Sequence, residues 1–170
     1  TTFAGTLDGN VILAKTGAGV LTLLTANSHR GGTVVNAGTL ALGASATLGW
    51  ANAALTANGG TLDLGGTSQT VGLVTLAGGT LANGSLTGKE YNAQSGTLTA
   101  TLLGAAPLRK TTAGVLNLGG STQNLTSLIL EGGSITNGVL NAGAYNLRSG
   151  TVAASITGAV PVTKTTSGIA

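Results

Sequence analysis

The sequence predicts an all-β protein, a parallel β-helix (β-solenoid) in which short coils of chain stack along one axis. One observation is an internal repeat: residues 61–114 align without a gap on residues 115–168, and repetition at a fixed offset is typical of stacked architectures. A second is a shorter period, because a Gly followed by Thr, Ser, Val or Ile returns every 17 to 22 residues. Together these periods predict coils of about 18 residues, with three coils in each 54-residue repeat.

Each of these glycine pairs is expected to open a β-strand on the same side of its coil. The pairs are Gly19-Val20, Gly38-Thr39, Gly60-Thr61, Gly79-Thr80, Gly96-Thr97, Gly114-Val115, Gly133-Ser134, Gly150-Thr151 and Gly168-Ile169. The residue that follows is almost always aliphatic: Leu21, Leu40, Leu62, Leu81, Leu98, Leu116, Ile135 and Val152. Because side chains alternate between the two faces of a strand, the aliphatic file is predicted to be buried and the Thr file to face outward.

Helices are not expected, since the segments between glycines are short and rich in β-branched residues. Turns are predicted at Asn83-Gly84 and Asn137-Gly138, which hold the same place in successive repeats and tolerate left-handed backbone angles. An up-and-down β-barrel is the competing architecture. It needs antiparallel hairpins with tight two-residue turns, and the chain has only these two Asn-Gly pairs.

We expect one continuous solenoid over residues 1–170, with a first section at 1–60 followed by tandem repeats at 61–114 and 115–168. The last residues, KTTSGIA, match a phrase that continues in the preceding repeat. The chain is therefore expected to be a fragment of a longer protein.

The composition excludes several classes of protein. Charged residues make up 6% of the chain and no run of Lys or Arg exists, so the clustered basic patch that nucleic-acid binding needs is missing. There is no Cys, which excludes disulfides and thiolate metal sites. No apolar stretch is long enough to predict a membrane span, and the first residues do not resemble a signal peptide.

Three phrases carry a more specific resemblance: residues 3–6 (FAGT), 13–23 (LAKTGAGVLTL) and 31–43 (GGTVVNAGTLALG). They closely resemble the autotransporter-associated β-strand repeat, found in passenger regions of bacterial autotransporters and in very large surface proteins. The phrase Lys-Thr-Gly-x-Gly-x-Leu-x-Leu at Lys15–Leu23 returns in modified form at Lys110–Leu118 and begins again at Lys164. The resemblance implies a right-handed parallel β-helix, export across the outer membrane, and a role as stalk or adhesin.

Catalytic groups are sparse. The acids are Asp8, Asp63, Glu90 and Glu131, and the last three are expected on different sides of the coil as isolated, solvated carboxylates. Glycoside hydrolysis needs a facing pair, so no catalytic residue is assigned. His29 is the single histidine, and it is expected to be an exposed loop residue. No metal-binding or cofactor-binding residue is predicted, and the protein is not expected to be an enzyme.

Three further sets of residues share places in the repeat. Lys15, Lys110 and Lys164 are expected to be charges at a bend that keep the rod soluble, with a cationic stripe for anionic glycans as the alternative. Tyr91 and Tyr145 are expected to cover a bend partly, with sugar-stacking platforms as the alternative. The Thr file resembles ice-binding β-helices only superficially, since Thr-x-Thr occurs once in the file, at Thr97-Leu98-Thr99.

The sequence therefore predicts a structural or stalk segment of a secreted bacterial cell-surface protein that supports a fibre or adhesin. A glycan-binding or host-binding adhesin module is the alternative, and a polysaccharide-degrading β-helix enzyme is a more distant one. Expected partners are copies of the chain itself, associating end to end or laterally, and surface glycans or host matrix. Nucleic acid and direct membrane insertion are not expected.

Overall fold

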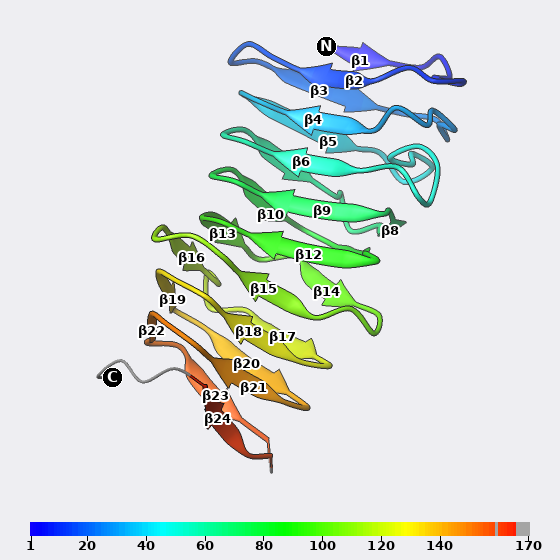
Figure 1. Ribbon diagram of the computed structural model, residues 1–170. Helices are drawn as coiled ribbons and strands as arrows, with labels where there is room; N and C mark the ends of the chain where they lie inside the picture. Colours follow the sequence, from blue (N-terminus) through cyan, green and yellow to red (C-terminus); the bar gives the residue numbers. More distant parts are fainter. Residues whose placement is uncertain (159, 166–170) are drawn as a thin grey trace.

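The structure is a computed structural model that describes residues 1–158 and 160–165. The described residues form 24 strands, which are stacked from β1 at one end of the molecule to β24 at the other (Figure 1). Every strand pair among the described residues is parallel. The predicted parallel β-solenoid is confirmed, and the antiparallel pairs of a β-barrel are not found there.

Two nine-stranded sheets form the first and second sides of the stack. The first sheet contains β1 (Thr2–Phe3), β3 (Val20–Leu23), β5 (Thr39–Leu42), β7 (Thr61–Asp63), β10 (Thr80–Ala82), β13 (Gly96–Leu98), β16 (Val115–Asn117), β19 (Ser134–Thr136) and β22 (Thr151–Val152). The second sheet contains β2 (Leu13–Lys15), β4 (Thr33–Val35), β6 (Leu55–Ala57), β9 (Leu73–Leu76), β12 (Glu90–Ala93), β15 (Leu108–Lys110), β18 (Leu128–Leu130), β21 (Tyr145–Leu147) and β24 (Val162–Lys164).

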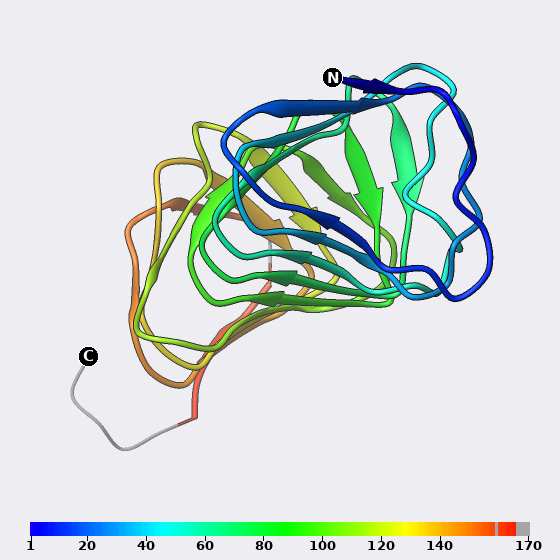
Figure 2. The same cartoon turned by 90° about the horizontal axis from the view of Figure 1, so that it is seen from above.

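The third side of the stack is discontinuous. It consists of two three-stranded sheets: β8 (Ser68–Thr70), β11 (Ser85–Thr87) and β14 (Thr101–Leu103), then β17 (Thr122–Leu125), β20 (Val139–Ala142) and β23 (Ser155–Thr157). The first three coils have no strand here and close through loops at 4–12, 24–32 and 43–54. Seen from above, the coils enclose a common interior, and the C-terminal coils are offset sideways from the N-terminal ones (Figure 2).

The interior is the predicted aliphatic column. Leu40, Leu62, Leu81 and Leu98 pair in direct register on neighbouring strands, and none is more than 2% exposed. The preceding threonines of the same strands are only half-buried on the outer face. Each aliphatic side chain buried in this way contributes on the order of 1.5–3 kcal/mol.

The register of the first sheet changes between the two 54-residue repeats. From β13 to β16 the pairs are Gly96 with Leu116 and Thr97 with Asn117. On the strands to either side, the aliphatic residues pair with one another, as Leu81 does with Leu98 and Leu116 with Ile135. The same register would place Leu98 opposite Leu116, so the alignment here is displaced by two residues. Because a strand has a period of two, the aliphatic side chains still face inward after the displacement.

The predicted turns are confirmed. Asn83 and Asn137 have φ values of 55° and 59°, in the left-handed region that asparagine tolerates. The pair Gly168-Ile169, expected to open another strand, lies outside the described residues.

Candidate functional site

Three buried amide side chains link coils on the third side, where strand pairing is interrupted. The Oε1 atom of Gln69 accepts a hydrogen bond from the Leu48 N–H at 3.0 Å, and its Nε2 donates to the Ala46 carbonyl at 3.0 Å. Gln123 makes the same two bonds to Leu102 and Ala100. Both glutamines are at least 96% buried, so their side chains take the place of the missing strand pairs.

Asn27 has a similar role among the loops. It is 6% exposed, accepts a hydrogen bond from Leu7 N–H at 2.9 Å and donates to the Thr47 carbonyl at 3.1 Å. Leu7, Asn27 and Thr47 belong to three successive coils. The loop side is therefore ordered by side-chain amides rather than by strands.

Lys15 and Lys110 are not the exposed bend charges that were expected. They are 6% and 0% exposed, and they belong to an inward file of the second sheet that continues through Leu130 and Leu147 to Lys164. The Lys15 ammonium donates to the carbonyls of Thr16, Gly17 and Ala37, at 3.0, 2.7 and 3.0 Å.

The Lys110 ammonium makes the equivalent contacts, donating to the carbonyls of Thr112 and Gly132, and burial lowers its pKa. The side chain of each of these two lysines therefore lies inside the coil and donates to backbone carbonyl oxygens at the bend that follows its strand. Lys164 is exposed and donates to the Arg148 carbonyl at 3.4 Å. A continuous cationic stripe is not present, because two of its three members are inside the coil.

Tyr91 and Tyr145 are also buried, at 2% exposure each, so neither can be a sugar-stacking platform. The Tyr91 hydroxyl accepts a hydrogen bond from Gly88 N–H and lies 2.7 and 2.6 Å from the carbonyl oxygens of Leu86 and Leu103. Burial raises the pKa of Tyr91. The hydroxyl of Tyr145 is held in the same way by Ala142, Leu140 and Thr157.

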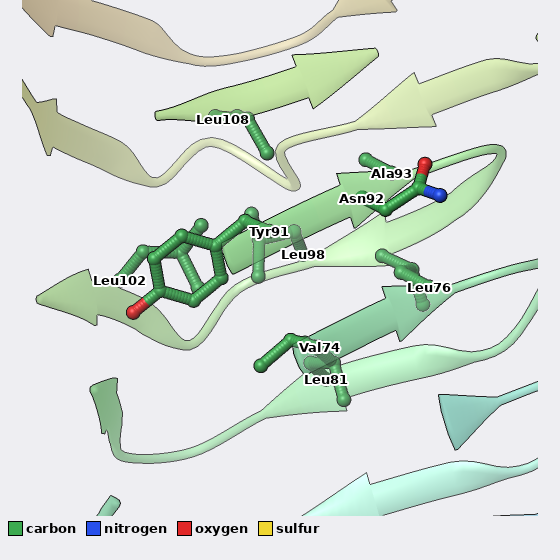
Figure 3. A pocket seen from close by; sticks show the side chains of 9 residues that line it. All are labelled: Val74, Leu76, Leu81, Tyr91, Asn92, Ala93, Leu98, Leu102 and Leu108. Carbon is green, nitrogen blue, oxygen red and sulfur yellow. The ribbon is translucent and has the colours of Figure 1, made fainter. Parts of the chain in front are cut away.

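A cavity of about 10 Å³ lies next to Tyr91, lined by side chains from all three sides of the coil (Figure 3). Its lining includes Val74, Leu81 and Leu102 and is almost entirely apolar. A cavity of this size holds at most a single water, and then only with polar partners. It is a packing gap rather than a ligand site.

The acids do not form a catalytic pair. Asp63 lies on the outer face of the first sheet, where its carboxylate accepts the Gly65 N–H at 2.9 Å. Its repeat equivalent Asn117 makes the same turn with Gly119. Glu90 begins β12 and Glu131 directly follows β18, so both flank the second sheet, and the expectation of three different sides was wrong.

Glu131 is not an isolated carboxylate, contrary to expectation. Its Oε1 atom lies 2.9 Å from a guanidinium nitrogen of Arg109 and 2.9 Å from one of Arg148. The three residues come from three successive coils and form a half-exposed ion-pair network along the second sheet. Such a network ties neighbouring coils together but supplies no catalytic acid or base.

His29 was expected to be exposed, and this was wrong. Its side chain is 0% exposed, its Nε2 lies 3.0 Å from the Thr33 hydroxyl, and its Nδ1 has no hydrogen-bond partner in the structure. Burial lowers its pKa. The backbone carbonyl of His29 accepts the Trp50 N–H at 2.9 Å, so this residue supports the neighbouring loop.

The loop side of the first three coils carries exposed charged and aromatic side chains. Trp50 is 47% exposed, and the Arg30 guanidinium lies over its ring, 5.7 Å from the centroid. Asp8 is exposed nearby, and its pKa is lowered by hydrogen bonds from the Ser28 hydroxyl and Gly9 N–H and by the charge of Arg30. We call Asp8, Arg30 and Trp50 the loop surface.

An open hollow of about 470 Å³ lies along the same loop, between the third coil and the fourth. Four hydroxyl side chains are among the residues that line it, and no charged residue does: Ser45, Thr47, Thr67 and Ser68. Sequence patterns did not single out this region, because Trp50 and Arg30 lie outside the periodic Gly-Thr-Leu phrases.

In 1–158 and 160–165, no group of three or more His, Cys, Asp or Glu side chains could hold a metal ion. Nor does that part of the chain contain a helix long and apolar enough to span a membrane.

The sequence is also similar to known proteins. Residues 13–42 match the family model of the passenger-associated-transport-repeat. The chain is also 33% identical over 167 residues to the adhesin BmaC autotransporter of Brucella suis biovar 1 (strain 1330), a match that covers 86% of the chain. The chain spans about 5% of the length of that relative. No solved structure matches the chain.

Proposed function

Because the chain carries an autotransporter passenger repeat at residues 13–42, we propose that it is a stalk segment of a secreted bacterial adhesin. In this function the segment stands outside the cell and separates the adhesive part of the protein from its anchor. The similarity to an adhesin autotransporter supports the cell-surface setting.

The observation that carries the proposal is the unbroken stacking of the coils. Both nine-stranded sheets run the length of the described chain, so each coil satisfies the backbone groups of the next and adds about 4.8 Å of height. Side-chain amides continue the linkage where the third side is interrupted. A stalk needs this property, because its length can grow without a new folding problem.

Replacing the whole segment within the full-length protein, displayed on the surface of cells, tests this function. Cells displaying the protein without residues 1–170 should adhere less well, and an unrelated β-solenoid with the same number of coils should restore adhesion. Full restoration supports a stalk, since only length is shared. A displayed protein that regains its length but not its adhesion would contradict the stalk and favour a specific binding contact.

Duplication of residues 61–114 provides a second measurement. The added repeat should lengthen the isolated chain by three coils, about 14 Å, in small-angle scattering, with no loss of thermal stability. A chain that becomes wider instead of longer would contradict the proposal.

The alternative function, a glycan-binding adhesin module, has one observation in its favour. Trp50 of the loop surface is exposed, and the hydroxyl-lined hollow lies along the same loop. The two functions are compatible, because a stalk can also carry a contact site.

A further inference from the structure

Trp50 is the exception among the aromatic side chains of this protein. The chain contains one Trp, one Phe and two Tyr, and both tyrosines are 2% exposed, whereas Trp50 is 47% exposed. An indole left in water forfeits one of the largest apolar burials that a side chain can make. Exposed, ordered aromatic side chains on loops are a common feature of binding surfaces.

The backbone of Trp50 is held in place without a ligand. Its backbone N–H donates to the His29 carbonyl at 2.9 Å, and its backbone carbonyl accepts the Ala53 N–H at 2.8 Å. The Arg30 guanidinium lies over the ring at 5.7 Å from the centroid. A loop backbone that is already ordered loses little conformational freedom on binding, which favours affinity.

The longest coil of the stack carries this residue. The register from Thr39 to Thr61 is 22 residues, against 19 from Thr61 to Thr80. The additional residues lie in the 43–54 loop, which contains Trp50 and forms one wall of the hollow. Stacking alone does not require this longer loop, since the later coils close without it.

The charges of the loop surface balance locally. Arg30 is the only cation on the loops at 4–12, 24–32 and 43–54, and Asp8 is the only anion there. The charge of Arg30 contributes to the lowered pKa of Asp8, so the two groups interact. A ligand with a net charge therefore gains little, whereas hydroxyl groups can bind both side chains.

We propose that the 43–54 loop is a contact site for a neutral oligosaccharide, with Trp50 as the stacking platform and the hydroxyl-lined hollow along residues 44–47 of the same loop as a second contact. A sugar ring has a C–H face that packs on an indole and a rim of hydroxyls that bind Ser and Thr side chains. The hollow, at about 470 Å³, has the size typical of small-molecule sites. The proposal goes beyond the stalk function, and it assigns a ligand class to the alternative function of a glycan-binding module.

Titration of the 170-residue chain with sugar oligomers tests the site. The probes are hexamers of glucose, mannose and N-acetylglucosamine, compared with a heparin hexasaccharide. Trp50 is the only Trp, so intrinsic fluorescence reports on this loop directly, and calorimetry measures affinity in variants without it. At least one neutral hexamer should bind and shift the emission, with the same affinity in 50 and 500 mM salt, since no net charge is neutralised.

Matched variants localise the binding. Trp50→Ala should weaken binding at least tenfold, Trp50→Phe should retain part of it, and Leu24→Ala, another exposed apolar residue on these loops at 43% exposure, should bind like the wild type. The three variants should have the same melting temperature, measured by circular dichroism. Binding to heparin alone, no binding to any neutral hexamer, or equal binding by the wild type and Trp50→Ala would each overturn the proposal.

These outcomes are independent of the stalk test. If an unrelated solenoid restores adhesion but no hexamer binds the chain, the stalk function stands and the contact site is lost. If a hexamer binds but the unrelated solenoid does not restore adhesion, the site stands and the simple stalk is lost.

Discussion

Gln69 and Gln123 occupy the same place in successive 54-residue repeats, and each joins its coil to the coil before it by the same pair of hydrogen bonds. Each bonds an N–H and a carbonyl two residues apart, as a neighbouring strand would. The join falls where the third side has no strand pairing, at the boundary between β14 and β17 in the case of Gln123. A single amide therefore preserves the backbone linkage across each repeat boundary.

Removal of this amide should destabilise the rod. Gln123→Ala leaves the Leu102 N–H and the Ala100 carbonyl without their partner in a buried setting, at about 1–3 kcal/mol for each unsatisfied group. Urea denaturation should therefore show a loss of about 2–6 kcal/mol in the free energy of unfolding. Gln94→Ala, a half-buried control on the second side, should change it by less than about 0.5 kcal/mol. Equal effects of the two variants would contradict this role.

The Tyr91 hydroxyl gives a second prediction. Tyr91→Phe keeps the ring but leaves the Gly88 N–H without its acceptor, so the free energy of unfolding should fall by about 1–3 kcal/mol. Thermal denaturation followed by circular dichroism measures the change. Tyr145→Phe should behave alike, because its hydroxyl has equivalent partners. A neutral result for both would mean that water replaces the hydroxyl.

The aliphatic part of the Lys110 side chain should contribute more to the stability of the fold than its charge does. Lys110→Ala removes both the buried methylenes and the bonds to the bend, so we expect a loss of about 2–4 kcal/mol in the free energy of unfolding. Lys110→Met keeps the packing and avoids burying a charge, so its loss should be smaller by more than about 1 kcal/mol. Lys89→Ala, at an exposed site, serves as the control. A Met variant as unstable as the Ala variant would show that the ammonium dominates.

The burial of His29 predicts that the free energy of unfolding depends on pH. Its folded pKa is lowered by burial, so the folded state favours the neutral ring, and the stabilisation is complete above the unfolded pKa of about 6.5. It should be lost as the pH falls below that value, with a slope no steeper than about 1.4 kcal/mol per pH unit. Chemical denaturation at several pH values measures it, with Trp50 fluorescence as the local probe.

The control for this titration is His29→Gln, which cannot change charge. Its stability should remain flat through the same range, because Asp8, the acid of the loop surface, has a lowered pKa and titrates at more acidic pH. Parallel losses in the wild type and the variant would assign the effect to another group.

Self-association remains a prediction. Asp63 is the only charged residue among the described strands of the first sheet, so little repulsion opposes lateral packing of two rods. Light scattering should show association that increases with protein concentration, and Thr80→Lys should reduce it by placing a charge on that face. A strict monomer at high concentration would contradict the prediction.

The regular part of the fold could be predicted because glycine, β-branched and aliphatic residues follow a fixed order. The burial of Leu40 and Leu62 follows directly from strand alternation. The buried polar side chains could not be predicted in the same way, since Lys and Gln are usually exposed and His is intermediate. Gln123 binds backbone groups of the coil before it and Lys110 binds a carbonyl of the coil after it, and only the three-dimensional register identifies those groups.

The sequence nevertheless contains one indication that some of these polar residues are buried. Gln69 and Gln123 are conserved between the two repeats of this chain, as are Tyr91 and Tyr145, although nearby polar positions differ. Agreement between repeats at a polar position indicates an internal partner. Trp50 has no repeat equivalent to compare, so its exposure required the structure.

The two-residue displacement between β13 and β16 has a consequence for any longer array of such repeats. Asn117, the equivalent of Asp63, aligns with Thr97 rather than with the column of Asp63, a sideways step of about 6.6 Å. The second sheet keeps its register across the same boundary, since Tyr91, Leu108, Leu128 and Tyr145 pair in one column. If each boundary added the same step, equivalent groups on the first side of a longer array would lie along an oblique line, whereas those on the second side would stay in a straight file.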